Sequence, residues 1–346
     1  MKAAVITRYG SPDVIKILDV PKPVPAAGEV LIRVHAATVN RTDCGELRPR
    51  PRILGRLLFG LRRPRRTIFG MDFAGVVEAA GAEVVSFKPG DRVFGLCPSR
   101  SNGAHAEYIC VPAKAPIAIM PANTHFDEAV VCEGALYANS GLKKFHIGPG
   151  HKILIYGASG AIGSAAVQLA KARGAEVTAV VATRQLELVK SLGADRVIDY
   201  TAEDFTRIGG SFDFVFEAVG KVSFFRSRRL LKPTGTFMAT DIGPWGEYLP
   251  LIIWSAITKN NRVLVPLPPR GCGQSFVEFL KSLIEAGQFR AVIDRRYPLD
   301  AIADAYRYVE TGQKVGIVVI NVAAADERAQ MTQASAYGAE IRVASR

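Results

Sequence analysis

The feature that most constrains the fold of this chain is an apolar run that leads directly into a glycine-rich turn. Residues 152–157 read KILIYG, which is typical of a buried strand, and the alanine-rich residues 161–173 that follow read as a helix ending at Gly174. Further strand-like and helical segments alternate after this unit as far as residue 267. Such alternation predicts a parallel, doubly wound sheet with helices on both faces.

The turn itself reads YGASGAIG and carries Gly157, Gly160 and Gly163. Backbone N–H groups at the amino terminus of a helix bind phosphate, and glycine lets a pyrophosphate approach closely. The first glycine lies one residue away from its place in the usual G-x-G-x-x-G motif, so an ordinary tight turn is the alternative. The strand–helix units around the turn favour a dinucleotide site.

The end of the second strand indicates which dinucleotide is bound. A site for NADH usually has Asp or Glu here, which binds the ribose 2′-hydroxyl. This chain has Ala182, Thr183 and Arg184 instead. A guanidinium and a hydroxyl bind a 2′-phosphate that a carboxylate would repel, so we predict NADPH as the cofactor. The alternative is that Arg184 is a solvated residue in the first turn of a helix.

The remainder of the chain predicts a second domain that is rich in strands. At 346 residues the chain is long for a single core. Its first third has short β-branched runs separated by Gly and Pro, a pattern typical of a small barrel or sandwich. We expect the strand at 314–322 to return to this domain. The predicted boundaries are a catalytic domain at 1–125 and 291–322, a dinucleotide-binding domain at 126–290, and a weakly structured tail at 323–346.

The cysteine content and the termini narrow the class of protein. There are five cysteines, none two residues apart from another, which argues against a zinc knuckle or a disulfide framework. The first residues lack the pattern of a secretory signal, and the longest apolar stretch, 248–258, is too short to cross a bilayer. We therefore expect a cytoplasmic protein.

Several motifs are those of a known superfamily. NRTD at 40–43 stands where zinc alcohol dehydrogenases have Cys-x-Thr/Ser-Asp, and GMDFAGVVEAAG at 70–81 stands where they have Gly-His-Glu and two later glycines. With these motifs first, the glycine turn second and a returning strand last, residues 1–322 resemble the medium-chain dehydrogenase/reductase superfamily. The resemblance implies an α/β fold in which a GroES-like β-barrel catalytic domain precedes a Rossmann domain, assembled as a homodimer.

Two departures from the zinc enzymes indicate the branch. Asn40 replaces the zinc-ligand Cys and Met71 replaces the zinc-ligand His, and neither an amide nor a thioether suits catalytic Zn²⁺. The four-cysteine lobe for structural zinc is also missing between Cys97 and Cys110. We therefore predict no metal site and a zinc-independent enzyme similar to quinone oxidoreductases and enone reductases. Bacterial proteins labelled NAD(P)-dependent alcohol dehydrogenases share further motifs, including SLGADRVIDY at 191–200.

The resemblance also implies two sets of site residues. The predicted cofactor-binding residues are Gly157, Ala158, Ser159, Gly160, Ala161, Ile162, Gly163, Thr183, Arg184, Tyr200, Ala218 and Val219. The predicted catalytic residues are Asn40, Thr42 and Tyr137. Thr42 aligns with the hydroxyl of the zinc enzymes' proton relay, and Tyr137 aligns with a position near the nicotinamide. Ile317 stands where the family often has Lys or Asn, which removes one expected cofactor contact.

Hydride transfer without a metal favours some acceptors over others. Alcohol oxidation suffers most, because no Lewis acid stabilises the alkoxide. In a quinone or an α,β-unsaturated carbonyl the charge spreads onto an oxygen that Asn40, Thr42 or Tyr137 can stabilise by donating a hydrogen bond. We predict NADPH-dependent reduction of such a compound. The alternatives are an NADP(H)-dependent alcohol dehydrogenase or carbonyl reductase, and a non-catalytic NADPH-binding scaffold.

Other polar residues receive structural interpretations. Tyr137 has a second interpretation, in which its ring only packs in the cleft and water supplies the proton. We expect Asp43 to hold its loop in place, Glu133 to be a helix-start residue stabilised by the helix dipole, and the five histidines to be structural or surface residues.

Residues 48–66 concentrate arginines among Leu, Ile and Phe and contribute much of the formal net charge of +12. By alignment with the superfamily we predict a loop or lid beside the active-site cleft. A solvated face, admission of an anionic small-molecule substrate, and weak contact with an acidic membrane surface are its three possible roles. No nucleic-acid partner is expected, because no recognition fold surrounds the segment.

Overall fold

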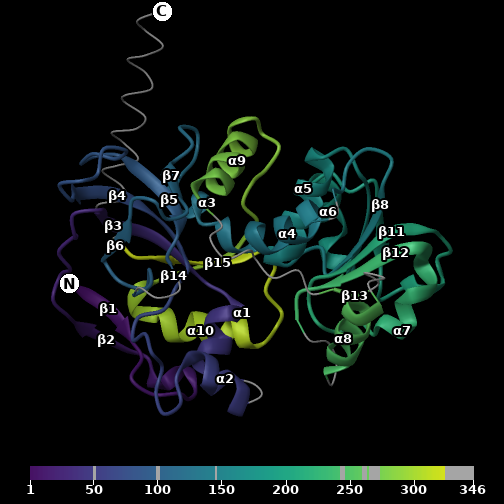
Figure 1. Ribbon diagram of the computed structural model, residues 1–346, viewed down its shortest axis with the longest axis horizontal. Coiled ribbons are helices and arrows are strands. Elements are labelled where there is room, and N and C mark those ends of the chain that lie inside the picture. Colours follow the sequence, from purple (N-terminus) through teal and green to yellow (C-terminus); the bar gives the residue numbers. More distant parts are fainter. Residues whose placement is uncertain are drawn as a thin grey trace, which may run out of the picture.

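Two β-sheets form the cores of two lobes that lie side by side (Figure 1). The computed structural model describes residues 1–49, 52–98, 102–144, 146–241, 246–258, 263–264 and 273–323. The first lobe contains the amino-terminal strands and the last described strand, and the second lobe contains the parallel sheet. The predicted α/β architecture with a GroES-like lobe and a Rossmann lobe is confirmed.

The sheet of the first lobe has the order β14-β15-β3-β4-β5-β7, with β6 also paired to β3. Its strands are β3 (Glu29–Val39), β4 (Asp72–Ala80), β5 (Arg92–Leu96), β6 (Tyr108–Pro112), β7 (Ile117–Ile119), β14 (Ile293–Pro298) and β15 (Ile317–Asn321). Strand β15 pairs antiparallel with β3, with Val318 opposite Val39. The predicted return of the final strand to the first lobe is therefore confirmed. A separate antiparallel pair joins β1 (Lys2–Val5) to β2 (Lys16–Asp19).

The sheet of the second lobe is parallel throughout and has the order β10-β9-β8-β11-β12-β13. Its strands are β8 (Lys152–Tyr156), β9 (Glu176–Val181), β10 (Arg196–Asp199), β11 (Phe212–Glu217), β12 (Leu231–Ala239) and β13 (Val263–Leu264). The chain runs outward from β8 in one direction and from β11 in the other. The strand order therefore reverses between β8 and β11, and ligands of doubly wound sheets bind at the carboxyl ends of the strands at such a point.

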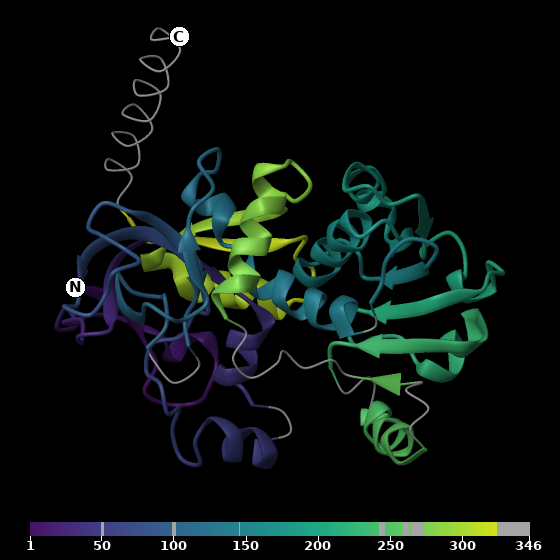
Figure 2. The same ribbon diagram turned by 45° about the horizontal axis from the view of Figure 1, so that its top comes forward.

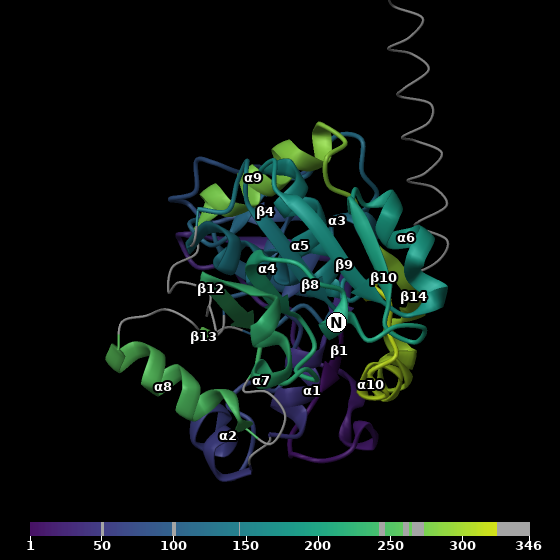
Figure 3. The same ribbon diagram turned by 90° about the vertical axis from the view of Figure 1, so that its right-hand side faces the viewer.

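Helices cover both faces of this parallel sheet. The helices of this part of the chain are α4 (Cys132–Lys144), α5 (Ala161–Ala172), α6 (Leu186–Ser191), α7 (Phe224–Ser227), α8 (Tyr248–Thr258) and α9 (Gln274–Glu285). The teal helices α4 to α6 lie on one side of the sheet and the green helices α7 and α8 on the other (Figures 1 and 2). Figure 3 shows α8 and β13 at one end of the sheet and α6 and β10 at the other. The predicted helix after the glycine turn is confirmed, and Gly174 follows it with a φ of +79°.

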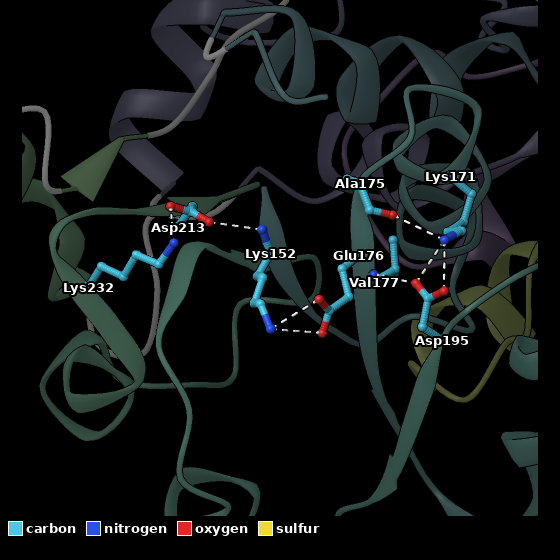
Figure 4. Close-up of polar contacts among 8 residues, drawn as sticks. All are labelled: Lys152, Lys171, Ala175, Glu176, Val177, Asp195, Asp213 and Lys232. Carbon is cyan, nitrogen blue, oxygen red and sulfur yellow. Dashed lines mark hydrogen bonds and ion pairs between the residues drawn. The ribbon is translucent and has the colours of Figure 1, made fainter. Parts of the chain in front are cut away.

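Ion pairs and hydrogen bonds stabilise the parallel sheet at the amino ends of its strands, opposite the glycine turn (Figure 4). The Lys171 ammonium contacts both oxygens of Asp195 at 2.8 Å, and Asp195 also accepts the Val177 N–H at 2.7 Å. Asp213 accepts hydrogen bonds from the Lys152 N–H and from the Lys232 ammonium. These contacts tie together the amino ends of β8, β9 and β11 and leave the carboxyl ends for a ligand.

The arginine-rich segment differs from its predicted form. Residues 52–59 form the helix α2 (Arg52–Phe59), which the prediction of a loop or lid did not include. Both ends of the segment are anchored: Arg48 donates to the Gly10 carbonyl at 3.0 Å, and Arg66 donates to both oxygens of Glu46. Arg66 is only 9% exposed, so it is part of the core rather than of a solvated face.

The remaining described helices of the first lobe are α1 (Arg41–Leu47), α3 (Phe126–Ala129) and α10 (Ile302–Glu310). Within the described ranges, the helices are all too short or too polar to span a bilayer. The predictions for Cys272 and for residues 324–346 lie outside the described residues.

Candidate active site

The glycine turn has the geometry that a pyrophosphate site requires. Gly157 follows β8 with a φ of +74°, a conformation that an L side chain would strain, and a Cβ there would meet a Val219 methyl at 2.6 Å. A Cβ on Gly163 would meet the Gly157 carbonyl oxygen at 2.1 Å, so this glycine lets α5 pack onto the turn. Gly160 is the N-cap of α5, and the N–H groups of the first helical turn have no acceptor within the helix.

The predicted residues of the nicotinamide end lie beside this turn. Ala218 and Val219 follow β11, the strand that neighbours β8, and the Ala218 N–H donates to the Tyr156 carbonyl at 3.1 Å. The structure therefore brings residues 157–163, 218 and 219 together. An oriented dinucleotide fits here, with its pyrophosphate over the amino terminus of α5.

The predicted 2′-phosphate residues are close together, with one addition. Thr183 donates its hydroxyl to Asp199 at 2.6 Å, and Tyr200 follows Asp199 at the end of β10. Arg184 has no hydrogen-bond or ion-pair partner among the described residues, so its guanidinium is available to a ligand. Hydrogen bonds from Thr183 and Thr201 lower the pKa of Asp199, which therefore remains ionised. The sequence prediction missed this carboxylate, although an acid at the end of the third strand was visible.

An aromatic cavity adjoins these residues. It has a volume of about 420 Å³ and is lined by Tyr156, Tyr200, Phe205 and Arg226 among others. The ring centroids of Tyr156 and Phe205 are 5.1 Å apart, and those of Tyr156 and Tyr200 are 5.8 Å apart. Because Tyr156 ends β8 and Tyr200 follows β10, the cavity lies at the carboxyl edge of the sheet, where an adenosine half would bind.

The predicted catalytic residue Asn40 begins α1. Its backbone N–H donates to the Asp43 carboxylate at 2.8 Å, and Asp43 also accepts the Gly70 N–H at 3.1 Å. Asp43 thus joins the start of α1 to the loop before β4, which agrees with the interpretation that it holds its loop in place. The Asn40 side-chain amide points instead to Glu133, at the start of α4.

Asn40 and Thr42 both contact Glu133, the second residue of α4. The Asn40 amide donates to Glu133 Oε2 at 2.7 Å, and the Thr42 hydroxyl donates to Glu133 Oε1. The backbone N–H of Glu133 donates to Asp72 Oδ1 at 2.8 Å. Thr38 completes the network, since it accepts from the Asn40 amide at 2.9 Å and donates to Asp72 Oδ2 at 2.9 Å. Glu133 is 3% exposed.

The sequence prediction missed Glu133 as a site residue and described it only as a helix-start residue. Its interactions come from strands and helices that are distant in the sequence. An acid within an otherwise apolar and small-residue run, VVCEGALYA at 130–138, was the available signal.

Burial shifts the pKa values of this network. Burial is the largest cause of the raised pKa values of Asp43, Asp72 and Glu133, each of which reaches about 7. Charge repulsion adds to the shift, since Asp43 raises the pKa of Glu133 and Glu133 raises the pKa of Asp72. Burial also lowers the pKa of Lys314 to about 8. The site therefore holds several groups that exchange protons near neutral pH.

Tyr137 lies one turn after Glu133 on α4, so the two side chains project from one face of the helix. Burial and then the charge of Glu133 raise the pKa of Tyr137 to about 12, which keeps the phenol protonated. Among the described residues, the Tyr137 hydroxyl has no hydrogen-bond partner. It is therefore a free donor beside the network.

The two lobes meet at this network. The Gly316 N–H, just before β15, donates to the Ser159 carbonyl in the glycine turn at 2.7 Å. A Cβ on Gly134, the neighbour of Glu133, would meet the Ala161 carbonyl at 2.8 Å. The polar network and the pyrophosphate turn are therefore adjacent parts of one site.

The residues that stand where the zinc alcohol dehydrogenases have zinc ligands do not fit a zinc ion. The Asn40 amide nitrogen donates to Glu133 and Thr38 and has no lone pair to offer a metal. Met71 supplies only a thioether, and no cluster of at least three His, Cys, Asp or Glu side chains within the described ranges is arranged to hold a metal ion. His105 is buried against the Thr38 carbonyl, and burial lowers its pKa to about 4, so it is a neutral structural residue.

This arrangement defines a class of protein, a two-lobed oxidoreductase that holds a dinucleotide at the junction of a barrel-like lobe and a Rossmann lobe. Residues 26–122 match the alcohol dehydrogenase GroES-like domain, and residues 192–320 match the zinc-binding dehydrogenase family. The chain belongs to the medium-chain dehydrogenase/reductase superfamily, in its zinc-independent branch of quinone oxidoreductase-like proteins.

Individual relatives agree with this assignment. The chain is 34% identical to 2-methylene-furan-3-one reductase of Solanum lycopersicum, over 93% of this chain and 79% of that protein. It is 32% identical to the chloroplastic NADPH-dependent alkenal/one oxidoreductase of Arabidopsis thaliana, over 92% and 79% of the two chains. The solved quinone oxidoreductase of Coxiella burnetii superposes with a TM-score of 0.81 at 28% identity, covering 93% of this chain and 99% of that one.

Proposed function

We propose that the protein reduces an α,β-unsaturated carbonyl or a quinone with NADPH and without a metal ion. The observation that carries this proposal is the Asn40–Thr42–Glu133 network, which stands where the zinc enzymes hold their metal and adjoins the glycine turn. Hydrogen-bond donors in this place stabilise an oxyanion but replace a Lewis acid poorly in alcohol oxidation. The names of the two plant relatives support reduction of an activated C=C bond.

Bound NADPH supplies the hydride in this reaction. The glycine turn and α5 hold the pyrophosphate, and Val219 packs beside the turn at the nicotinamide end. Tyr137 donates a hydrogen bond to the carbonyl oxygen as negative charge develops on it, and the Thr42 hydroxyl is held beside it by Glu133 in the buried network.

NADPH in preference to NADH is the second part of the proposal. Arg184 has no partner among the described residues and follows Thr183 directly, so it can reach a 2′-phosphate. Asp199 accepts the Thr183 hydroxyl, so we assign Arg184 rather than Thr183 the main interaction with the phosphate. A cytoplasmic homodimer is the accompanying prediction, and light scattering tests the dimer.

The test is NADPH oxidation by the purified protein across a panel of acceptors, with NADH in parallel and with and without a chelator. We expect turnover with 2-alkenals, enones or quinones, little with simple aldehydes or alcohols, and no effect of the chelator. Turnover confined to simple aldehydes and alcohols would instead indicate a carbonyl reductase or alcohol dehydrogenase. NADPH binding without turnover of any acceptor would indicate a nucleotide-binding scaffold.

A further inference from the structure

Among the described residues, Glu133 is the only acid that accepts hydrogen bonds from both the Asn40 amide and the Thr42 hydroxyl. Each carboxylate oxygen has a different partner: Oε2 accepts the Asn40 amide at 2.7 Å, and Oε1 accepts the Thr42 hydroxyl. An amide N–H is always a donor, whereas a hydroxyl both donates and accepts. The two oxygens of Glu133 are therefore chemically distinct.

This difference fixes where a proton on Glu133 must lie. A proton on Oε2 would point at the donor group of Asn40, which accepts nothing on its nitrogen. The other partners of the Asn40 amide, Thr38 Oγ1 at 2.9 Å and Asp72 Oδ2 at 3.5 Å, are also acceptors, so the amide orientation is determined by the network. A protonated Glu133 thus carries its hydrogen on Oε1 and donates it to Thr42.

Donation by Glu133 reverses the direction of the Thr42 hydrogen bond. With Glu133 ionised, the Thr42 hydrogen is bound to Oε1 and is not available to another group. With Glu133 protonated, Thr42 Oγ1 accepts from Glu133 and its own hydrogen turns outward. Only the second state can deliver a proton to a substrate.

We propose that Glu133 is the proton store of the reductase, the group that holds the proton later delivered to the substrate. The proton passes through the Thr42 hydroxyl, so Glu133 itself does not touch the substrate and is a positioning residue. This inference rests on the proposed enone reduction. The enone gains the hydride that bound NADPH supplies at its β-carbon, which leaves an enolate. The Thr42 O–H bond then breaks as its proton forms the new bond at the α-carbon, and the Glu133 O–H bond breaks as its proton restores the Thr42 hydroxyl. Glu133 is left as a carboxylate and takes a proton from water, so that the enone, NADPH and one solvent proton give the saturated carbonyl and NADP⁺.

The position of Glu133 suits this role. Its neighbour Gly134 lies so close to Ala161 that no Cβ fits between α4 and the start of α5, which is the pyrophosphate end of the cofactor site. The proton store is therefore next to the cofactor and, at 3% exposed, has only slight contact with bulk water.

The charged and titratable groups around Glu133 come from four elements. The charge of Asp43 on α1 raises the pKa of Glu133, and the charge of Glu133 raises that of Asp72 on β4. The hydrogen bonds from Thr42 and Asn40 and the charge of Lys314, before β15, lower the pKa of Glu133. Tyr137 on α4 remains neutral. Burial prevails, and it raises the pKa of Glu133 to about 7, so protonated and ionised forms coexist near neutral pH.

The test combines kinetics with a measurement that needs no turnover. Glu133→Gln keeps the size and the acceptor for Asn40 but has no proton to transfer, and Glu128→Gln, at the start of α3, is the matched control. With NADPH and an enone, we expect the wild-type kcat to fall as pH rises through about 7. We expect the Glu133→Gln kcat to be about 10²-fold lower at pH 6 and to lack this limb. A wild-type pH profile in Glu133→Gln would overturn the inference.

Infrared difference spectra of the cofactor-free protein between acidic and alkaline pH give the second readout. We expect a carboxylic acid C=O band that titrates near neutral pH and is reduced in Glu133→Gln but not in Glu128→Gln. An identical set of bands in the wild type and Glu133→Gln would show that Glu133 does not store a proton. If the wild type turns over no enone or quinone, the proposed function fails, and this spectrum still decides whether Glu133 holds the proton.

Thr42 variants test the proton path independently, including the case in which Glu133→Gln does not fold. Thr42→Val retains the shape of the side chain but has no hydroxyl, so it should lose both the activity and the pH limb, and Thr42→Ser should keep both. An active Thr42→Val variant with the wild-type pH profile would exclude the path through Thr42.

Discussion

The Gly316 N–H donates to the Ser159 carbonyl at 2.7 Å, which links the start of the final strand of the first lobe to the pyrophosphate turn of the second. Gly316 has a φ of +67°, and a Cβ there would meet the Val292 carbonyl oxygen at 1.8 Å. The contact therefore depends on glycine at this position, both for the backbone conformation and for space.

Gly316→Ala should weaken NADPH binding by about tenfold or more, because the backbone must move away from Val292 and the link to Ser159 changes. Fluorescence titration of NADPH measures this change. Gly287→Ala is the control: Gly287 has a similar φ of +68° and open space around its Cβ position, so it should show the cost of the conformation alone, about 1 kcal/mol of stability, with unchanged NADPH affinity. Equal NADPH affinities in Gly316→Ala and the wild type would contradict this account of the lobe contact.

Arg184→Ala should raise the Kd of NADPH by at least tenfold and leave that of NADH unchanged, since only NADPH carries the 2′-phosphate. Isothermal titration with both nucleotides is the measurement. Arg196→Ala removes an exposed arginine at the opposite end of β10 and should change neither affinity. An equal rise in the Kd values of NADPH and NADH in Arg184→Ala would show that Arg184 does not bind the 2′-phosphate.

Tyr137→Phe should lower kcat for enones about tenfold and leave the Kd of NADPH unchanged, because it removes a hydrogen-bond donor and keeps the ring. The raised pKa of Tyr137, about 12, means that its contribution should not change between pH 6 and 9. Steady-state kinetics at several pH values measure this. A wild-type kcat in Tyr137→Phe would indicate that the ring only packs.

The stability of the protein should depend on the protonation of Glu133. The folded-state pKa of about 7 is raised from an ordinary value of 4.5, so the stabilisation is complete below about pH 4.5 and is lost as pH rises through 7. Such a shift corresponds to about 3 kcal/mol for one group. The lowered pKa of His105 acts in the opposite direction between pH 4 and 6.5, so the comparison requires a variant.

Glu133→Gln should therefore gain stability relative to the wild type, by about 3 kcal/mol, between pH 4.5 and pH 8. Urea unfolding of both proteins across this range gives the difference at each pH. A difference that stays constant with pH would show that Glu133 does not carry the shifted pKa.

The pairing of Arg66 with Glu46 should contribute strongly to stability. Arg66 is 9% exposed and contacts both Glu46 oxygens, at 2.7 and 2.8 Å. Glu46→Gln leaves a buried guanidinium without its counter-charge, which should cost about 3 kcal/mol in urea unfolding. Glu285→Gln breaks the exposed pair with Lys281 and should cost less than about 0.5 kcal/mol. A similar small effect at both positions would mean that Arg66 is solvated in solution.

Local sequence patterns predicted much of the fold because they determine local structure. The apolar run 152–157, the glycines of the turn and the Ala-rich helix specify a strand, a turn and a helix without reference to distant residues. The helix α2 was not predicted, because Gly55 and the flanking prolines and arginines obscure its period. The segment that contains it is anchored on either side of the helix, by Arg48 to Gly10 and by Arg66 to Glu46.

The sequence by itself determined the dinucleotide turn, the missing zinc ligands at Asn40 and Met71, and the arginine near the expected 2′-phosphate, since each depends on residue type at a fixed local spacing. Only the tertiary structure decided that Asn40, Thr42, Asp72 and Glu133 form one buried network. Burial and the approach of groups from different elements shift the pKa of Glu133, and neither quantity exists until β4, α1 and α4 pack together.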